Sequence, residues 1–412
     1  MTDIQKENKS GGKVPNLRFP NFYGEWEVKT LGKIMDFKVT NSFSRENLNY
    51  EYGKVKNIHY GDIHTKFQTL FDINYESVPF INEEIDISRI SDENYCKNGD
   101  IVFADASEDL NDVGKSIEII NTNGEKLLSG LHTLLARPKQ DVFHLGFSGY
   151  LFKSNSVRVQ IQKESQGSKV LSINVGRISK VELSFPPVEE QRKITSFLSL
   201  IDSRIKTQNK IINDLKTLKT TLSKKIFSQE LRFKDDKGNE FLEWENILLG
   251  DTLDYEQPTN YLVSSTEYDD SFEIPVVTAG KTFILGYTDE KKGVFEKEKL
   301  PVIIFDDFTT ASQFVDFPFK AKSSAMKILK AKNDTNIRFI FEALQMINYE
   351  VGGHGRHWIS VFSNLSISVP SLPEQTKIAN FLSAIDSKID MENQLLQKLE
   401  EQKKYLLQNM FV

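Results

Sequence analysis

An internal repeat at a constant spacing of 184 residues constrains this chain more than any other feature. Residues 186–206 read PPVEEQRKITSFLSLIDSRIK, and residues 370–390 read PSLPEQTKIANFLSAIDSKID. Twelve of the 21 aligned positions are identical without a gap, which predicts one structure built twice. The identical positions, numbered in the first copy, are Pro186, Glu190, Gln191, Lys193, Ile194, Phe197, Leu198, Ser199, Ile201, Asp202, Ser203 and Ile205.

A second repeat opens each half of the chain. Residues 25–37 read EWEVKTLGKIMDF, and residues 243–255 read EWENILLGDTLDY. The tripeptide LRF stands upstream of each, at 17–19 and at 231–233. The bodies that follow, about 38–180 and 256–365, share little sequence. Repeated flanking segments around divergent bodies are expected when the two bodies recognise different targets.

Each copy of the first repeat, at 186–206 and at 370–390, continues into a predicted long amphipathic helix. Apolar residues recur with alternating 3-4 spacing over about five heptads, which indicates the a/d seam of a coiled coil. A helix of about 40 residues would be roughly 60 Å long. The seam positions of the first helix are Ile194, Leu198, Ile201, Ile205, Gln208, Ile212, Leu215, Lys219, Leu222 and Ile226. Those of the second are Ile378, Leu382, Ile385, Ile389, Glu392, Leu396, Leu399, Lys403, Leu406 and Met410.

Two such helices in one chain pair most simply with each other, as antiparallel partners related by a pseudo-two-fold axis. The alternative is a coiled coil between copies of the chain. Polar seam residues recur at matching places, Gln208 with Glu392 and Lys219 with Lys403. Such residues usually fix the register of a coiled coil rather than add stability.

The expected fold is therefore mixed α/β. Two globular domains, mostly β with some helix, are joined by two long antiparallel coiled-coil helices. The predicted segments are a first domain at 1–185, a helix at 186–228, a second domain at 229–369 and a helix at 370–412.

The distribution of charge is uneven although the formal net charge is only −6. The segment from Asp72 to Asp112 contains twelve acidic residues and two basic ones. The segment from Lys126 to Lys180 contains nine basic residues and two acidic ones. This asymmetry predicts one face for an anionic partner and another that avoids it. An unevenly charged solvated surface is the alternative interpretation.

Other features narrow the class of protein. Cys96 is the single cysteine, so an intrachain disulfide and cysteine-rich zinc ligation are excluded. No run approaches the roughly 18 apolar residues of a membrane span, and the first residues lack the apolar region of a secretory signal. We therefore expect a cytoplasmic protein without a membrane partner.

The doubled segment P-x-x-x-E-Q-x-K-I-x-x-F-L-x-x-I-D-S-x-I resembles the conserved regions of specificity subunits of type I restriction-modification enzymes. GDIVFADAS at 99–107 resembles a strand segment common in their recognition domains. The resemblance implies two target-recognition domains, each reading one half of a bipartite DNA site. It also implies helices that set an unread spacer and dock two methyltransferase subunits, with separate restriction and translocase subunits joining for cleavage.

We expect no catalytic centre, metal or cofactor in this chain, and adenosylmethionine in the partner methyltransferase. The chain has no G-x-G-x-x-G and no N-P-P-Y or D-P-P-Y tetrad. AGKT at 279–282 indicates a turn, because Pro275 stands where a phosphate-binding loop needs glycine. Asp306 and Asp307 would point to opposite faces of a strand. The glycines around His354 and His357 favour a loop over a metal-binding helix.

Candidate contacts to double-stranded DNA are polar side chains able to reach phosphates or base edges. In the first body they are Lys54, Lys56, His59, Tyr60, His64, Lys66, Lys163, Gln166, Ser168 and Lys169, with Lys153, Arg158 and Ser165 nearby. In the second they are Lys281, Thr282, Thr309, Thr310, Lys320, Lys322, Ser323, His354, Arg356 and His357. Residues 162–169 are predicted to be a loop between two strands, 158–161 and 169–175. For each residue, the alternative is an ordinary solvated side chain.

Three other functions are alternatives to DNA recognition in a restriction-modification complex. They are a nuclease or stand-alone methyltransferase, a coiled-coil assembly scaffold, and a DNA-binding protein without a restriction role. The missing motifs argue against an enzyme, and the divergence of the two bodies argues against a scaffold.

Overall fold

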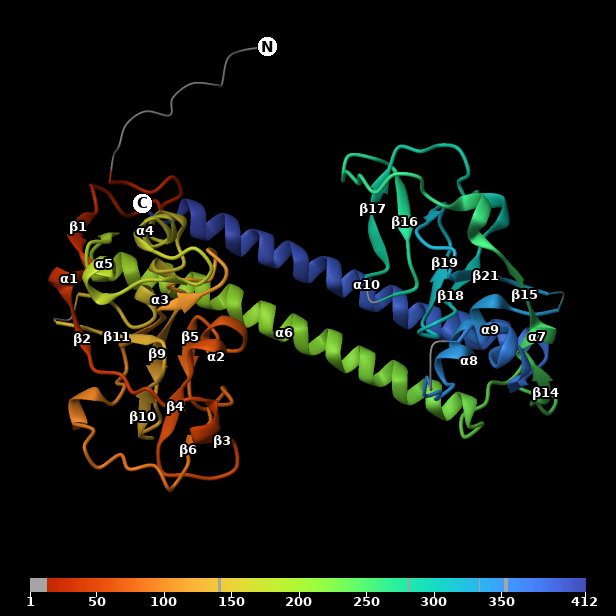
Figure 1. Ribbon diagram of the computed structural model, residues 1–412, viewed down its shortest axis with the longest axis horizontal. Helices are drawn as coiled ribbons and strands as arrows, with labels where there is room; N and C mark the ends of the chain where they lie inside the picture. The colour runs from red at the N-terminus through yellow and green to blue at the C-terminus, as the bar shows by residue number, and fades with distance from the viewer. Residues whose placement is uncertain (1–12, 140–141, 281, 333, 352–354) are drawn as a thin grey trace, which may run out of the picture. The chain divides into compact units, whose positions relative to one another are not determined.

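The computed structural model describes residues 13–139, 142–280, 282–332, 334–351 and 355–412, and they form two compact units (Figure 1). Unit 1 comprises Met1–Gln208 with Leu395–Val412, and unit 2 comprises Asn209–Gln394. This division differs from the predicted boundaries at 185, 228 and 369, because each long helix contributes one half to each unit.

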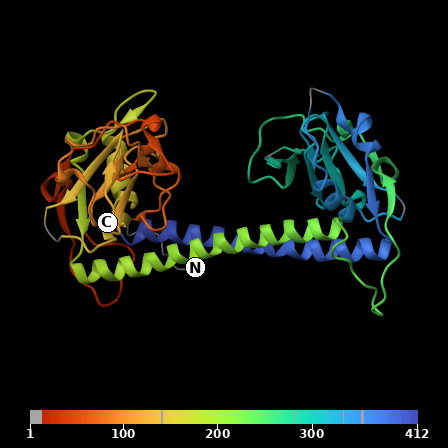
Figure 2. The same cartoon turned by 90° about the horizontal axis from the view of Figure 1, so that it is seen from below.

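The two long helices are α6 (Val188–Phe227, 40 residues) and α10 (Leu372–Asn409, 38 residues). In unit 1 the start of α6 packs beside the end of α10, and in unit 2 the end of α6 packs beside the start of α10. Figures 1 and 2 both show the helices side by side within each unit. The predicted antiparallel pairing of helices within one chain is therefore confirmed.

The predicted seam is buried along both helices. Leu198 and Leu382 have no exposed surface, while Ile205, Leu215 and Ile385 are half-buried. Five further seam positions are also buried, namely Ile194, Ile201, Ile378, Ile389 and Leu399. Since each fully buried Leu or Ile side chain contributes roughly 1.5–3 kcal/mol, the seam is the main source of stability in the helical part of each unit.

The polar seam residues form the same ion pair in both units. Lys403 Nζ lies 2.5 Å from Asp202 Oδ1 in unit 1, and Lys219 Nζ lies 2.7 Å from Asp386 Oδ2 in unit 2. Both the lysines and the aspartates are related by the offset of 184. A one-turn slip of the helices would separate each lysine from its aspartate, so these pairs specify the register.

The Glu-Gln dipeptide anchors the start of each long helix. Gln191 donates its side-chain amide to the carbonyl of Pro186, and Gln375 does the same to Pro370. Their side-chain carbonyls accept the N–H groups of His144 and Asn336 respectively. Each glutamine thus closes the turn before its helix and joins the helix to the neighbouring body.

The neighbouring glutamates form buried ion pairs with the arginines of the two LRF segments. Arg18 binds Glu190 at 2.7 Å, and Arg232 binds Glu374 at 3.0 Å. Glu190 is 1% exposed and Glu374 0%. The phenylalanines of the same tripeptides make edge-to-face contacts, Phe19 with Phe197 and Phe233 with Phe381. These contacts explain why LRF recurs at a distance from the helix repeat.

The EW segments form the edge of each body. β1 (Glu27–Thr30) pairs antiparallel with β13 (Glu182–Phe185), and β14 (Glu245–Leu248) pairs in the same way with β22 (Ser366–Val369). A short helix follows each, α1 (Leu31–Ile34) and α7 (Leu249–Thr252). A Cβ on Gly32 would lie 2.8 Å from Ser179 Cβ, and one on Gly250 would lie 2.9 Å from the carbonyl of Ser363. Close packing therefore requires glycine in both copies.

The body of unit 1 contains two larger sheets. The five-stranded sheet comprises, in order, β2 (Met35–Lys38), β11 (Thr133–Pro138), β7 (Ile101–Ala104), β9 (Ser116–Asn121) and β5 (Leu70–Asp72). The four-stranded sheet comprises β10 (Leu127–Ser129), β4 (Lys56–Ile58), β6 (Phe80–Ile81) and β3 (Leu48–Asn49). β8 (Ala106–Ser107) pairs with β12 (Leu171–Ser172). The helices are α2 (Tyr60–Thr65), α3 (Phe147–Leu151), α4 (Asn155–Glu164) and α5 (Val175–Ile178).

The body of unit 2 is a smaller version of the same plan. Its four-stranded sheet comprises β15 (Leu253–Glu256), β21 (Met326–Ala331), β18 (Val302–Asp306) and β19 (Ser312–Val315). Its three-stranded sheet comprises β17 (Ile284–Thr288), β16 (Ile274–Val277) and β20 (Lys320–Ala321). The helices are α8 (Ile337–Gln345) and α9 (His357–Ser360). The predicted mixed α/β class with mostly β bodies is confirmed.

We predict that Glu374→Gln lowers the free energy of unfolding of unit 2 by about 3 kcal/mol, because the Arg232 guanidinium loses its buried partner. Urea unfolding followed by circular dichroism measures the change. Glu243→Gln is the matched control, since Glu243 lies 3.5 Å from the same arginine but is 90% exposed. The control should change stability by less than about 0.5 kcal/mol. Equal effects of the two variants would contradict the role assigned to the buried pair.

Candidate nucleic-acid interface

Asp105, directly after β7, joins three segments of unit 1. Its N–H donates to the carbonyl of His132 at 3.0 Å, and its own carbonyl accepts the N–H of Ile173 at 2.8 Å. Its carboxylate Oδ1 lies 3.3 Å from His132 Nδ1. Burial raises the pKa of Asp105, and the neighbouring His132 opposes that shift. The end of β7 thus positions the loops on either side of it.

The structure brings two separately predicted groups of the first body together. His64 Nε2 on α2 lies 3.2 Å from the carbonyl of Ala106 in β8. β8 pairs with β12, and Ser172 of β12 exchanges backbone hydrogen bonds with Gln166. The α2 segment and the loop at 165–172 are therefore neighbours on one surface, which we call the first candidate interface.

Aromatic and imidazole rings form the centre of this interface. The ring of Tyr60 lies 4.6 Å from that of His59, 5.3 Å from His132 and 6.0 Å from His64. Tyr60 and His64 are half-buried, and the side chain of His132 is 51% exposed. Such rings can contact base edges, and imidazole nitrogens can donate or accept hydrogen bonds there.

Several predicted basic residues are already engaged by carboxylates. Lys66 lies 3.1 Å from Asp62, which Arg45 also binds through two hydrogen bonds. Burial disfavours ionisation of Asp62, but the bonds from Arg45 and Lys66 prevail and hold its pKa below the usual value. Lys56 lies 2.7 Å from Glu125. Carboxylates therefore partly neutralise the charges of Lys56 and Lys66, which makes these lysines weaker phosphate ligands than the sequence indicated.

His59 is corrected from a predicted DNA contact to a structural residue. It is 8% exposed and stands at the N-cap of α2, where its Nδ1 accepts the N–H of Gly61 at 3.1 Å. Burial, together with the charge of Arg45, lowers the pKa of His59. Because the ring is buried and its Nδ1 accepts the helix-capping hydrogen bond, His59 is not presented as a surface contact to a base.

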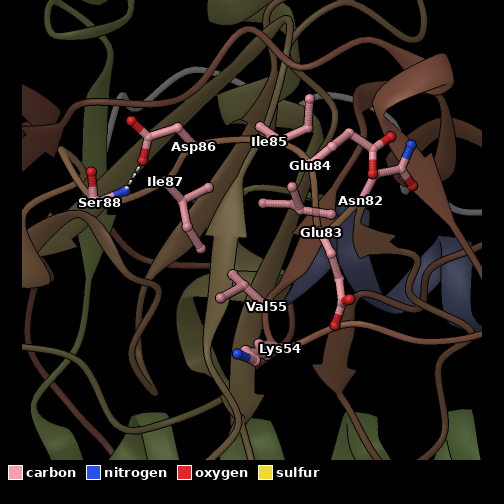
Figure 3. A pocket seen from close by; sticks show the side chains of 10 residues that line it. Lys54, Val55, Asn82, Glu83, Glu84, Ile85, Asp86, Ile87 and Ser88 are labelled. Atoms are coloured by element: carbon pink, nitrogen blue, oxygen red, sulfur yellow. Dashed lines mark hydrogen bonds between the residues drawn. The ribbon is translucent and has the colours of Figure 1, made fainter.

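Lys54 is exposed but lies among carboxylates. It lines a pocket of about 610 Å³ with Glu83, Glu84 and Asp86 (Figure 3). Figure 3 shows Asp86 accepting the backbone N–H of Ser88, a bond of 2.9 Å. The negative charge of this pocket disfavours a phosphate there.

The loop at 165–172 is exposed, but the predicted strand before it is wrong. Residues 158–161 belong to α4, where Val157 and Ile161 lie four residues apart and are both buried. Val157 and Ile161 thus form one apolar face of a helix rather than part of a strand. Gln166, Ser168 and Lys169 are exposed on the loop, and Lys163 is exposed on α4. The strand predicted at 169–175 reduces to β12, and α5 follows it.

Strand pairing identifies Asp307 as the counterpart of Asp105. Val102 of β7 pairs with Leu135, which also pairs with Lys38, the fourth residue of β2. Ile304 of β18 pairs with Ile328, which also pairs with Glu256, the fourth residue of β15. Val102 and Ile304 therefore occupy equivalent positions. Asp105 and Asp307 each lie three residues later. The correspondence between the two halves of the chain therefore extends from the helices into the bodies.

Asp307 organises the loops of unit 2 more tightly than Asp105 does in unit 1. Its carboxylate lies 3.3 Å from Lys327 Nζ and accepts the N–H of Trp358 at 2.7 Å. Its carbonyl accepts the N–H of His357 at 3.0 Å, and its own N–H donates to Ala325. Asp306 points the other way and caps the turn through the N–H groups of Phe308 and Thr309. The two carboxylates lie on opposite faces, as predicted.

Around Asp307 lies a set of exposed polar side chains, which we call the second candidate interface. Thr309 and Thr310 form the β18–β19 turn, Ser323 lies in the loop before β21, and Arg356 precedes α9. Thr309, Ser323 and Arg356 are exposed, and Thr310 is half-buried. The Arg356 guanidinium can donate two hydrogen bonds to the same guanine base.

The β16–β17 turn adjoins the same loops. The N–H of Lys322 donates to the carbonyl of Val277, and the Thr278 hydroxyl donates to the carbonyl of Thr282. Thr282 is exposed, while Lys322 is half-buried with its ammonium 5.6 Å from the ring centre of Tyr268. Lys281 and His354 were also predicted to contact DNA, and both lie outside the described residues.

His357 and Lys320 are corrected to structural residues. His357 is 6% exposed, and its Nδ1 lies 2.9 Å from the carbonyl of Asp307. Lys320 is 3% exposed, and its ammonium lies 2.7 Å from Glu290 and donates to the carbonyl of Lys292. The bond from Lys320 lowers the pKa of Glu290 to about 2, with help from the N–H groups of Ser265 and Ser264. Buried side chains that are bonded in this way hold loops rather than DNA.

Sequence reasoning did not single out Arg45 and His132, although both belong to the first interface. Neither stands in a recognisable motif, and His132 approaches Asp105 only through the pairing of β11 with β7. Two further findings hold for the described part of the chain. No three His, Cys, Asp or Glu side chains converge in an arrangement suited to a metal ion. No helix there combines the length and apolar character of a membrane span.

The fold and the two interfaces define a class of protein, one that presents two similar frames with different recognition loops. The sequence profile described as the type I restriction modification DNA specificity domain matches residues 23–217 and 242–401. The chain belongs to this family of specificity subunits, and its role is recognition of a DNA sequence. The resemblance noted in the two helix repeats is therefore confirmed.

Individual relatives agree with this assignment. The EcoR124I/EcoR124II specificity subunit of Escherichia coli is 47% identical over 152 residues, which span 34% of this chain and 37% of that protein. The MjaVIII specificity subunit of Methanocaldococcus jannaschii is 26% identical over 63% of this chain and 68% of its own length. The crystal structure of the type I S subunit from M. genitalium has the same fold, with a TM-score of 0.61 and 16% identity over 97% of this chain and 99% of that one.

We predict that Asp307→Asn loosens the second interface, because the buried Lys327 ammonium loses its counter-charge. The free energy of unfolding should fall by about 3 kcal/mol. Hydrogen exchange should accelerate first in residues 323–327 and 355–364. Asp316→Asn is the control, since Asp316 is exposed on the same body and should leave both measurements unchanged. Unaltered exchange in Asp307→Asn would show that the loops do not depend on this carboxylate.

Proposed function

We propose that the two bodies each read one half of a bipartite DNA site, with unread base pairs between the halves. The observation that carries this proposal is the repetition of one frame around different loop residues. Asp105 and Asp307 hold equivalent loops, yet the exposed side chains on those loops differ. Equivalent frames would bring each set of loops to DNA in the same manner, while different side chains would select different bases.

The two interfaces offer different hydrogen-bonding chemistry to bases. Unit 1 presents Tyr60, His64 and Gln166, which combine aromatic surface with a side-chain amide suited to adenine. Unit 2 presents Thr309, Ser323 and Arg356, which combine small hydroxyls with a guanidinium suited to guanine. Ser168 and Lys169 would contribute phosphate contacts that position the first body without reading sequence.

The methyltransferase partners of the complex would dock on the long helices. In unit 2, Ile211 and Leu218 of α6 are 39% and 48% exposed although both are large and apolar. They stand seven residues apart and therefore share one face of the helix. Exposed apolar side chains at this spacing suit a partner helix. We place two methyltransferase subunits there in the full complex, with adenosylmethionine in those subunits and restriction and translocase subunits joining them.

The first experiment is methylation mapping with an exchanged body. Co-expression of this chain with its methyltransferase subunit, followed by single-molecule sequencing, should show methylated adenines in a two-part motif with a fixed unread spacer. Replacing residues 256–365 with the body of another family member should change one half of the motif and leave the other half and the spacer intact. A change in both halves, or a motif without a spacer, would refute the division of labour between the bodies.

The second experiment tests the docking face. Ile211→Lys with Leu218→Lys should weaken association with the methyltransferase subunit by about tenfold or more, because two charges replace apolar contacts. Its thermal unfolding should match that of the unmodified chain, since both side chains are exposed. Asn213→Lys with Thr220→Lys is the control, with the same spacing and charge on a different face of α6. Light scattering after size exclusion measures assembly, and equal assembly by both variants would exclude this docking face.

A further inference from the structure

A surface cavity of about 490 Å³ lies in unit 1. It lies between one face of α4, the turn at Asn111 and the last turns of α10, with Ile205 of α6 at one side. Figure 1 shows α4 close to the C-terminal end of α10. The lining contains four cationic side chains and one carboxylate, namely Lys153, Arg158, Lys403, Lys404 and Glu400.

Two of the cations are bound by neighbouring groups. Lys403 pairs with Asp202, whose other oxygen accepts the hydroxyl of Tyr150 at 2.8 Å. Arg158 donates through Nη2 to the carbonyls of Asn111 and Val113, at 3.0 and 2.8 Å. Its Nη1 is buried without a hydrogen-bond partner. The guanidinium is therefore held in place by uncharged acceptors, and its charge is not cancelled by an ion pair within the described residues.

Lys153 has no partner of its own. No hydrogen bond or ion pair joins its ammonium to another residue in the described ranges, although the side chain is half-buried. Burial lowers the pKa of Lys153 to about 7, with the charges of Lys115, Lys403 and Arg158 acting in the same direction and Asp202 opposing them. Lys404 on α10 is exposed and likewise unpaired among these residues. The cavity thus gathers more positive charge than its own carboxylates balance.

We propose that this cavity binds a phosphate group, with Lys153 and Lys404 as direct ligands and with Arg158 and Lys403 reinforcing the positive field. The amide side chains of Asn155 and Gln162 also line the cavity and can donate hydrogen bonds to phosphate oxygens. An anion would supply the counter-charge that Lys153 lacks.

The phosphate has two possible sources, the DNA backbone and a free phosphate compound. The loop after β8 connects the cavity to the first candidate interface: Arg158 donates to the carbonyl of Asn111 in this loop, and the carbonyl of Ala106 in β8 lies 3.2 Å from His64 Nε2. This proximity favours a backbone phosphate next to the bases that unit 1 reads. Only this DNA source rests on the proposed function, and the cavity chemistry stands without it.

The test uses the full chain with two probes, sodium tripolyphosphate and a 30-base-pair duplex of arbitrary sequence. Lys153→Met with Lys404→Met should weaken binding of the phosphate source by about tenfold. For DNA it should also reduce the slope of log affinity against log salt by about 1, the value for one lost phosphate contact. Lys180→Met with Lys398→Met removes two other exposed lysines of unit 1 and should change affinity less than twofold. Lys404→Met alone keeps the half-buried side chain intact, so it tests the site if the double variant folds poorly.

Each result has one meaning. Weaker DNA binding with a smaller salt slope, relative to the control, identifies a backbone phosphate. Weaker tripolyphosphate binding with unchanged DNA binding identifies a free phosphate ligand. Equal behaviour of the cavity and control variants with both probes overturns the site. The bipartite methylation motif should keep its bases in all variants, so a failure of bipartite recognition in the unmodified chain is a separate result.

Discussion

A buried carboxylate at the start of each long helix is the constraint on which the rest of the structure depends. Glu190 and Glu374 bind the arginines of the two LRF segments and are almost completely removed from solvent. An unpaired carboxylate there would cost several kcal/mol, so each helix start and its lead-in segment stabilise each other. The adjacent glutamines bind the bodies as well. Helix, lead-in segment and body are thereby fixed to one another twice in the same chain.

In the pair of long helices, apolar residues provide the stability and polar residues specify the register. Leu198 and Leu382 are fully buried, and burial of such side chains supplies most of the free energy in the seam. The Lys403–Asp202 and Lys219–Asp386 pairs are partly solvated, so each contributes roughly 0–1 kcal/mol. Their value lies in the register, because only one alignment satisfies both pairs. A fixed register is what a protein needs if two bodies must present their loops in a constant relation to the helices that carry them.

The same logic of constant frame and variable surface continues into the bodies. Asp105 and Asp307 use their backbone groups in equivalent ways, yet only Asp307 holds a buried lysine. In unit 1 the corresponding carboxylate faces a partly exposed histidine instead. A frame of backbone hydrogen bonds tolerates such exchange, because it does not depend on which side chains the loops present. This tolerance accounts for two bodies that share a plan and little sequence.

The sequence by itself determined the features that repeat or that follow a short period. Two long antiparallel helices and two bodies of one class followed from the offset of 184 residues, the a/d seam and the LRF and EW segments. These features can be recognised in sequence because a buried helix face requires apolar residues at a short, regular spacing. The sequence did not determine which polar side chains are free. His59, Lys320 and His357 look like surface groups in sequence, but pairing of distant strands and loops buries them. The segment 158–161 was predicted to be a strand, but it belongs to a helix whose Val157 and Ile161 pack into the core. Tertiary structure decided these cases, because burial and hydrogen-bond partners come from segments far apart in the chain.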